Sequence, residues 1–350
     1  METPLTNEHQ AAGARLSDFS DCVLPESFSD FDSEYRAARE RTAQLDTNWH
    51  AVITLKGPDR VRYLNAIVTN NVQSLSEGHG VLALLLNPQG HILAEFEVYA
   101  LPDNLLLLSH ASVRERTLAT LDKYIIMDDV QMDDLTDQVG SLAIEGPRTA
   151  GIVRQACGVA LEDLPELAVR DVTIERIPCH LLRRSHFGET GVEFITRQDR
   201  LSSLWQKLLA AVRAHGGQAI GMSAANALRL EAGVPWFPVD FNDSVIPHEA
   251  ALEETHVSFS KGCYTGQEIV ERVRSRGQVN RRRVGLKFSA AKPPLAGTKL
   301  RAGEADAGYV TSAAFSPAAG TAIGMGYVRR EHGAPGNRLN LDGEVAEVTK

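Results

Sequence analysis

The chain has 350 residues, which is too long for one typical domain and suits two or three. Hydrophobic residues make up 43% and charged residues 23%, a balance that supports a sizeable core and argues against a disordered or fibrous protein. The formal net charge of -9 argues against extensive electrostatic binding of nucleic acid but leaves room for a local basic patch.

No apolar run reaches the length of a membrane span, and the polar start of the chain resembles neither a signal peptide nor a transit peptide. We therefore expect a cytoplasmic protein with no membrane contact. The cysteines Cys22, Cys157, Cys179 and Cys263 form no C-x-x-C pair, so we expect reduced thiols and no stably bound metal. The alternative that one of these cysteines shares a cluster with another protein stays open.

The first 217 residues alternate helical and β-prone segments. Residues 1–30 look like a mobile polar leader, and residues 31–140 like the first part of an α+β region. A strand, a Gly-Pro turn and a helix occur at 55–69 and again from 141 to 157, which suggests that residues 141–217 form a second α+β domain. The predicted strands are 49–55, 81–86, 91–101, 105–109, 125–131, 141–144, 172–177, 179–185 and 191–196, and the predicted helices include 33–45, 60–69, 112–124, 200–215 and 224–231.

The last third changes character. Residues 218–280 form a loop-rich return segment. Beyond Gln278, short β-prone runs alternate with Gly and Pro turns, a pattern that predicts a small β-barrel over residues 281–350. The predicted barrel strands are 284–288, 298–301, 308–315, 323–328, 338–341 and 345–348.

The sharpest motif is Lys261-Gly262-Cys263-Tyr264-Thr265-Gly266-Gln267-Glu268. Two glycines bracket Cys263 and Tyr264, so we expect the backbone to bend and to approach something closely. Lys261 would favour the thiolate of Cys263, whereas Glu268 would oppose it if it lies nearby. A turn that holds one buried, inert cysteine is the alternative.

K-G-C-Y-x-G-Q-E is the signature of the YgfZ family of folate-binding proteins, and its seven specified positions match here. Other segments resemble elements of the wider glycine-cleavage T-protein superfamily. Residues 55–59 with 68–70 resemble its first folate-domain motif, residues 142–147 resemble its "ALQGP" element, and residues 228–233 match its "LRLEAG" element. The resemblance implies an α+β fold in which two ferredoxin-like, T-protein-type folate-binding domains form a ring with a small C-terminal β-barrel. A tetrahydrofolate, or a one-carbon derivative of it, would occupy the centre.

The resemblance also implies site residues. The stretch 188–193 resembles "GEDGFE" of the T-protein, whose last glutamate receives the ring N–H donors of the pterin, and this places that role on Glu193. An exposed strand residue is the alternative for Glu193, and a surface helix charge is the alternative for Arg229. The candidate catalytic residues are Cys263 and Lys261, and the candidate folate-binding residues are Glu193, Arg229, Tyr264, Gln267 and Glu268.

One segment departs from the T-protein pattern. T-protein catalysis uses an Asp-Asp pair just after a Gly-Gly, and the matching segment here is Gly90-His91-Ile92-Leu93-Ala94-Glu95. Ala94 cannot accept a proton, and Glu95 has a longer reach than an aspartate. The asparagine of a following stretch is replaced by His110. These changes put aminomethyl transfer in doubt while leaving a folate cavity intact.

A basic run comprises Arg272, Arg274, Arg276 and the triplet 281–283. If residues 272–276 form a strand, the three alternate arginines lie on one face. Such a stripe could meet the polyglutamate tail of folate, a phosphate backbone or an acidic partner. A solvated strand and linker is the alternative, and no interleaved aromatic residue supports RNA stacking.

From these observations we expect a tetrahydrofolate-binding auxiliary protein for the assembly or repair of iron–sulfur enzymes, with Cys263 as the working thiol. The family resemblance implies iron–sulfur client enzymes, tRNA-modifying ones among them, or assembly proteins as partners. One alternative is a folate-dependent aminomethyltransferase, or another one-carbon transferase, that relies on Glu95. A second alternative is an RNA-binding module that uses the 272–283 stripe.

Overall fold

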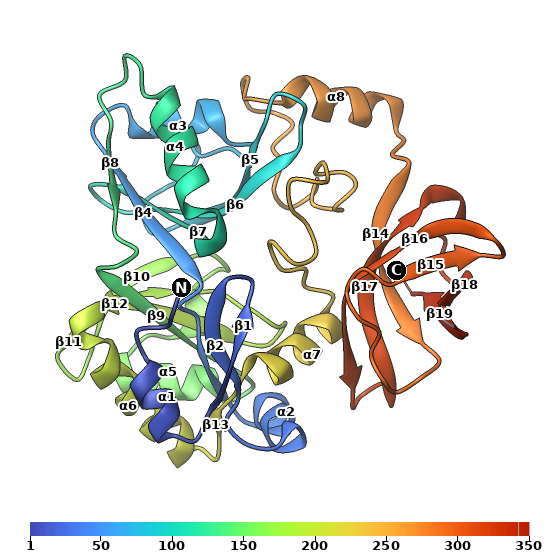
Figure 1. Cartoon of the computed structure of the whole chain (residues 1–350). Helices are drawn as coiled ribbons and strands as arrows, with labels where there is room; N and C mark the ends of the chain where they lie inside the picture. Colours follow the sequence, from blue (N-terminus) through green and yellow to red (C-terminus); the bar gives the residue numbers. More distant parts are fainter. Residues whose placement is uncertain (342, 350) are drawn as a thin grey trace. The chain divides into compact units, whose positions relative to one another are not determined.

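The computed structural model describes residues 1–341 and 343–349, and the chain divides into two compact units. Unit 1 comprises residues 1–65, 71–83 and 96–225, and unit 2 comprises residues 66–70, 84–95 and 226–350. Among the helices described, none is long and apolar enough to cross a membrane. The elements are labelled in Figure 1.

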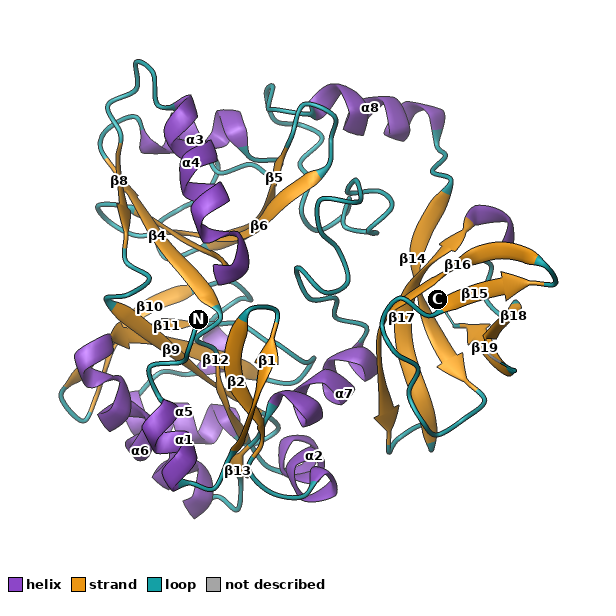
Figure 2. Ribbon diagram, viewed as in Figure 1, coloured by secondary structure: helices purple, strands orange, loops and turns teal. Residues whose placement is uncertain are grey.

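The first unit is built on two β-sheets (Figure 2). The six-stranded sheet has the order β10-β11-β12-β9-β3-β13, and the five-stranded sheet has the order β5-β6-β7-β4-β8. The six strands are β3 (Ala43–Asp46), β9 (Val139–Glu145), β10 (Val169–Ile174), β11 (Ile177–Leu182), β12 (Gly191–Arg197) and β13 (Gln218–Ala219). The five strands are β4 (His50–Lys56), β5 (Gly80–Leu86), β6 (Ile92–Ala100), β7 (Leu105–His110) and β8 (Gln131–Asp134).

Helices α5 (Thr149–Cys157) and α6 (Gln198–Ala214) contribute to the core on one face of the six-stranded sheet. Six apolar residues of α6 recur at the spacing of one helix face and are buried. They pack on Leu142 and Ile144 of β9 and on Phe194 of β12. These buried α6 residues are Leu201, Leu204, Trp205, Leu208, Leu209 and Val212.

A second apolar cluster joins the two sheets. Val52 and Leu108 of the five-stranded sheet pack with Leu182 and Ile195 of the six-stranded sheet. Three further helices are α2 (Phe31–Glu40), α3 (Arg60–Ile67) and α4 (Arg114–Tyr124). The position of β8 differs from the predicted strand 125–131, since residues 125–130 form a loop and pairing with β4 starts at Gln131.

The prediction of a mobile leader at residues 1–30 is wrong, because this segment is folded. It contains α1 (Thr6–Ala11) and a hairpin of β1 (Arg15–Phe19) and β2 (Cys22–Ser27). His9 is fully buried, with its Nε2 2.6 Å from an Asp46 carboxylate oxygen and its ring 4.8 Å from that of Trp205. A few buried side chains therefore anchor a segment that is polar in composition.

Unit 2 ends in a closed six-stranded barrel of order β14-β17-β16-β15-β18-β19, which confirms the predicted barrel. Its interior holds apolar residues that alternate along the strands, such as Val284, Leu286 and Phe288. Figure 2 shows the closed arrangement. The strands are β14 (Arg281–Phe288), β15 (Lys299–Ala302), β16 (Ala305–Ser316), β17 (Thr321–Arg329), β18 (Arg338–Leu341) and β19 (Glu344–Val348).

The carboxylate of Asp240 ties the segment that follows α7 (Met222–Ala232) to the barrel. One oxygen accepts hydrogen bonds from Thr311 Oγ1 at 2.6 Å and Ser312 Oγ at 2.5 Å, both on β16. The other oxygen accepts from the Trp236 backbone N–H at 3.0 Å and from the guanidinium of Arg229. The side chains of Asp240 and Arg229 are both almost completely buried. Among the partners named here, Arg229 is the only one that carries a charge opposite to that of Asp240.

The first part of the basic run lies in a helix instead of the predicted strand, and the triplet 281–283 begins β14. Helix α8 (Gln267–Arg276) carries Arg272 and Arg274, and residues two apart on a helix point to nearly opposite sides. The side chain of Arg276 lies outside the described part of the structure. Since the stripe does not share one face, the basis for the RNA-binding alternative is lost.

We predict that Asp240→Ala destabilises the protein by about 3–5 kcal/mol, because it leaves the guanidinium of Arg229 buried without its counter-charge. Arg338→Gln is the matched control, since Arg338 pairs with Glu347 at an exposed position and its loss changes stability by less than about 1 kcal/mol. Urea denaturation of both variants measures the difference. Equal stabilities would show that the buried pair contributes no more than a surface pair.

Candidate functional site

Glu193 lies on β12 and is completely buried in unit 1. Its Oε1 accepts a hydrogen bond from Thr47 Oγ1 at 2.8 Å and lies 3.1 Å from His50 Nε2. Its Oε2 lies 3.1 Å from His186 Nε2. The geometry of the His50 contact is that of an ion pair and not of an aligned hydrogen bond. Glu193 is thus a buried carboxylate and not an exposed strand residue.

Electrostatics keep Glu193 ionised. Burial raises the pKa of this carboxyl, but the charge of His50 and the hydrogen bond from His186 outweigh it and hold the pKa well below its usual range. For His50, burial lowers the pKa, and the charge of Glu193 more than compensates, so that the pKa is raised. A carboxylate offers about four acceptor positions, so three protein contacts leave capacity for one further donor.

Lys261 is the first residue of the motif loop in unit 2, and its amine contacts two backbone carbonyl groups. Its Nζ donates to the carbonyl of Val68 at 2.5 Å and to that of Asn70 at 3.2 Å. Burial lowers the pKa of this amine to about 8. The Lys261 amine therefore stays mostly protonated at neutral pH, although it loses its proton more readily than an exposed lysine, and it anchors the loop on residues 68–70.

The four thiols differ sharply in exposure. Cys22 and Cys179 are buried and Cys157 is intermediate, whereas Cys263 is exposed. Burial raises the pKa of the Cys22 thiol to about 11 and also raises that of Cys179 to about 11, which makes both poor nucleophiles. Of these four thiols, Cys263 is the one that a partner or a reagent can reach directly.

The three remaining candidates of the motif have different surroundings. Tyr264 is buried, and the Lys261 ammonium lies 5.0 Å from the centre of its ring. Gln267 is half-buried at the start of α8. The side chain of Glu268 is 83% exposed and pairs with Arg272 one helical turn later at 2.6 Å, an arrangement typical of a surface helix. Among the three, Glu268 has the weakest structural case for a ligand contact.

The predicted bend of the loop is present at Gly266. This residue has a φ of +81°, and a Cβ there would approach the carbonyl oxygen of Asn87 to 2.6 Å. A side chain at this position would therefore be strained and would also collide with the turn that precedes β6. The predicted close approach is thus made at Gly266 to the chain's own backbone, whereas a Cβ at Gly262 would meet nothing within 4 Å.

Glu95 forms a carboxylate–imidazole pair with His256. Glu95 Oε1 lies 2.9 Å from His256 Nε2, and Thr255 Oγ1 lies 2.7 Å from the other ring nitrogen. Glu95 keeps 23% of its side chain exposed, while Ala94 is fully buried. Sequence reasoning identified Glu95 but missed His256, because no local spacing connects residues 161 positions apart.

Arg229 is neither a surface charge nor a freely available cation, because its guanidinium is enclosed in the core of unit 2. Besides Asp240, it donates to Asn226 Oδ1 at 2.9 Å and to the carbonyl of Val234 at 3.2 Å. Its guanidinium carbon lies 4.8 Å from the ring centre of Trp236. This environment supports a structural role and gives no support to the expectation that Arg229 binds folate.

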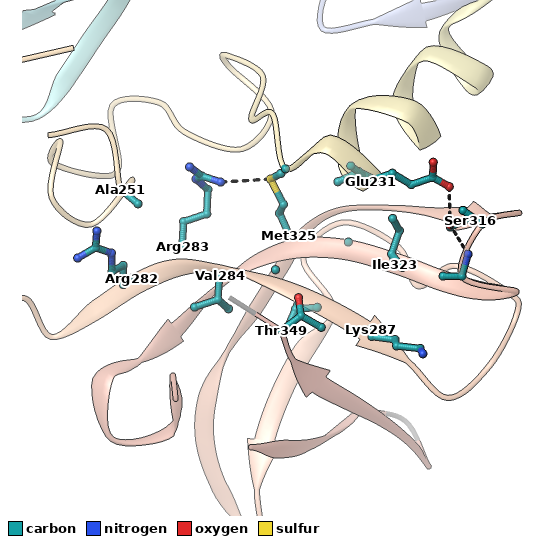
Figure 3. A pocket seen from close by; sticks show the side chains of 17 residues that line it. Glu231, Ala251, Arg282, Arg283, Val284, Lys287, Ser316, Ile323, Met325 and Thr349 are labelled. Carbon is teal, nitrogen blue, oxygen red and sulfur yellow. Dashed lines mark hydrogen bonds between the residues drawn. The ribbon is translucent and has the colours of Figure 1, made fainter. Parts of the chain in front are cut away.

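A pocket of about 640 Å³ lies beside the barrel within unit 2 (Figure 3). Arg282, Arg283 and Lys287 line it together with apolar groups such as Ile323 and Met325. Arg283 donates through Nε to the carbonyl of Ala250 at 2.9 Å and through Nη1 to Met325 Sδ at 3.3 Å. Its second terminal nitrogen, Nη2, has no protein partner within the described residues, so this pocket presents a partly engaged guanidinium.

Over residues 1–341 and 343–349, no group of three or more His, Cys, Asp or Glu side chains is arranged to hold a metal ion. The titratable groups gathered here instead form pairs and small hydrogen-bonded clusters, which suit proton handling and ligand binding.

An α+β unit with two sheets, followed by a closed six-stranded barrel, defines a T-protein fold. The chain belongs to the glycine-cleavage T-protein family: residues 5–261 match the GCVT N-terminal domain, and residues 281–348 match the glycine cleavage T-protein C-terminal barrel domain. This confirms the fold class and the superfamily that the sequence motifs predict.

Relatives match along almost the whole chain. An aminomethyltransferase of Streptomyces coelicolor is 31% identical over 340 residues, covering 95% of this chain and 91% of the relative. One of Rubrobacter xylanophilus is 29% identical over 94% of this chain and 87% of the relative. The crystal structure of the glycine cleavage system aminomethyltransferase T from Bartonella henselae superposes with a TM-score of 0.90 at 25% identity, covering 100% of this chain and 97% of that one.

Proposed function

We propose that the protein binds tetrahydrofolate and transfers a one-carbon unit, as an aminomethyltransferase of the glycine-cleavage T-protein type. The observation that carries this proposal is the pair formed by Glu95 and His256 at 2.9 Å. Family membership and the aminomethyltransferase names of the relatives support the same function. This function replaces the iron–sulfur role as the leading hypothesis.

The chemistry of aminomethyl transfer requires a group that handles a proton. Two folate nitrogens each lose a proton as they bond to the methylene carbon. One proton goes to the lipoyl sulfur as the C–S bond breaks, and the other goes to the departing amine as the C–N bond breaks. Glu95 can accept or return such a proton, and His256, oriented by Thr255, can hold it in between. The retained carboxylate at position 95 thus supplies what Ala94 cannot.

Each of the two units also supplies a candidate binding group in this proposal. Glu193 receives one N–H donor of the pterin, for which one acceptor position of its carboxylate remains. The carboxylates at the glutamate end of a folate are anions, and Arg283 with its uncommitted Nη2 suits an anion of that kind. Lys261, Tyr264 and Gln267 remain candidate site residues of unit 2.

We predict that Glu95→Gln lowers folate-dependent ammonia release from an aminomethylated lipoyl carrier about 10²- to 10⁴-fold, since the amide can no longer exchange the proton. Glu268→Gln is the control, because Glu268 is an exposed carboxylate paired only on the helix surface. Single-turnover assays at saturating folate measure the rates. A Glu95→Gln variant as active as the control would refute proton transfer through Glu95.

We predict that Glu193→Gln weakens tetrahydrofolate binding roughly ten- to hundredfold, because a hydrogen bond to a charged acceptor contributes about 1.5–3 kcal/mol. Glu189→Gln is the matched control four residues earlier, where the carboxylate pairs with Arg39 in a partly exposed position. Titration calorimetry gives both affinities. Equal affinities for the two variants would remove Glu193 from the folate site.

A second candidate function rests on Cys263. The complete K-G-C-Y-x-G-Q-E signature resembles the YgfZ family, and an exposed thiol in this loop suits a transient contact with a cluster or a client protein. In this hypothesis the protein is a folate-binding auxiliary factor for iron–sulfur enzymes, tRNA-modifying ones among them, and folate orders the site or carries a one-carbon unit.

We predict for this second candidate that Cys263→Ala folds normally but fails to restore iron–sulfur enzyme activities in a deletion strain. Removing one exposed sulfur atom should alter stability by less than about 0.5 kcal/mol. Cys157→Ala is the control, since Cys157 is only partly exposed and outside the motif. Cys22 is unsuitable because it is buried, contrary to its predicted place in a leader.

The same assays separate the two functions. Full complementation by Cys263→Ala together with loss of ammonia release in Glu95→Gln would leave only the transferase. Loss of complementation in Cys263→Ala, with no ammonia release from the wild-type protein, would leave only the auxiliary factor.

A further inference from the structure

A small pocket of about 90 Å³ lies in unit 1, beneath the start of the chain. Met1, Glu2 and Pro4 form part of its lining, so the folded N-terminal segment contributes directly to it. The other side is lined by polar groups that include Asn48, His50 and Ser141. A volume of this size holds a few water molecules but no organic cofactor.

His50 connects this pocket with the buried carboxylate of Glu193. Its ring lines the pocket with a side chain that is 8% exposed, while its Nε2 lies 3.1 Å from Glu193 Oε1. Glu193 itself has no exposed surface. His50 is therefore placed between a space that water can enter and a carboxylate that water does not reach.

The charged and titratable groups around His50 come from several elements. Glu193 on β12 and Glu97 on β6 raise its tendency to be protonated, and Arg184 opposes them. His110 on β7 lies opposite His50 across the β4–β7 ladder, and burial lowers the pKa of His110 to about 3, so it stays neutral. His186 contacts the other oxygen of Glu193 but does not line the pocket.

We propose that His50 is a proton relay, which exchanges protons with water in the pocket beneath the N-terminal segment and passes them to and from Glu193. The transfer requires a small turn of the His50 ring, because Nε2 lies 3.1 Å from Glu193 Oε1 without the alignment of a hydrogen bond. As an imidazolium, His50 then gives its Nε2 proton to Glu193 Oε1; the N–H bond breaks, an O–H bond forms, and a neutral ring protonated at Nδ1 remains. Return of the proton restores the ion pair. His50 is a positioning residue here, because it acts through Glu193.

The relay solves a physical problem of the buried site. A carboxylate with no exposed surface cannot change its protonation state without a donor that reaches solvent. If Glu193 receives an N–H group of a pterin, any proton that the carboxylate has taken up must leave before the ligand binds, because the ionised form is the better acceptor. This meaning of the relay rests on the proposed function, whereas the coupling between His50 and Glu193 is a property of the protein alone.

Deuterium exchange at the Cε1–H of individual histidines, followed by mass spectrometry over a range of pH, tests the relay without any ligand. This exchange requires both protonation of the ring and access to solvent. We expect His50 to exchange at least roughly tenfold faster than His9, which is completely buried beside Trp205. Exchange of His50 as slow as that of His9 would overturn the proposal.

Two variants test the coupling. In Glu193→Gln the midpoint of the His50 pH profile should fall, because the charge that raises its pKa is lost. Glu189→Gln should leave the profile unchanged. A His50 profile that is the same in Glu193→Gln as in the wild type would refute the relay.

The last experiment measures the His50 exchange profile of the wild-type protein after tetrahydrofolate is added. The midpoint of His50 should shift on binding, since the ligand competes for the acceptor that His50 faces. Binding without any shift would overturn the relay while leaving the proposed function intact. Absence of binding would instead overturn the proposed function, and the exchange profiles of the ligand-free protein would still decide whether His50 and Glu193 are coupled.

Discussion

A carboxylate can be buried only where donors or positive charges surround it, and each unit of this protein contains such a group that joins distant segments of the chain. Glu193 in unit 1 gathers Thr47, His50 and His186, whereas Asp240 in unit 2 gathers Arg229 and two hydroxyl groups of β16. Leaving either carboxylate unpaired would cost several kcal/mol. The need to pair these carboxylates determines which distant segments of the chain lie in contact. The residues that contact Glu193 and Asp240 are therefore drawn from segments far apart in the sequence.

The two carboxylates nevertheless serve different ends. All partners of Asp240 are fixed protein donors, one of them an arginine that stays charged, so this group acts as a permanent anchor. The partners of Glu193 are a hydroxyl and two imidazoles, and imidazoles change charge near neutral pH. A buried charge that is balanced by titratable groups can respond to a ligand, which an arginine pair cannot do. The chemistry of the partners therefore separates an anchor from a candidate site.

Much of the fold was predictable because it depends on periodicity. The apolar face of α6 and the short alternating strands of the barrel are local patterns, and both predictions are confirmed. Predictions failed where a few distant contacts decide the outcome. Burial of His9 beside Asp46 folds an otherwise polar leader. Likewise, Asp240 and His256 were invisible as partners of Arg229 and Glu95, since side-chain pairing across folded segments leaves no spacing in the sequence. The strand predicted for residues 272–276 failed for a local reason, since glycines in the left-handed conformation at both ends bound a helix there.

The departure at Ala94 carries less weight once strand geometry is considered. Successive side chains of β6 point to opposite faces of the sheet, and Ile92, Ala94 and Phe96 all lie on its fully buried face. A carboxylate at position 94 would need donors in an apolar core, so alanine is the residue that this face tolerates. Position 95 lies on the other face, where its carboxylate is partly exposed and already paired with His256. The loss of one member of an acidic pair therefore removes the group that faces the core and retains the group that a substrate could reach, which is why the segment remains compatible with proton transfer.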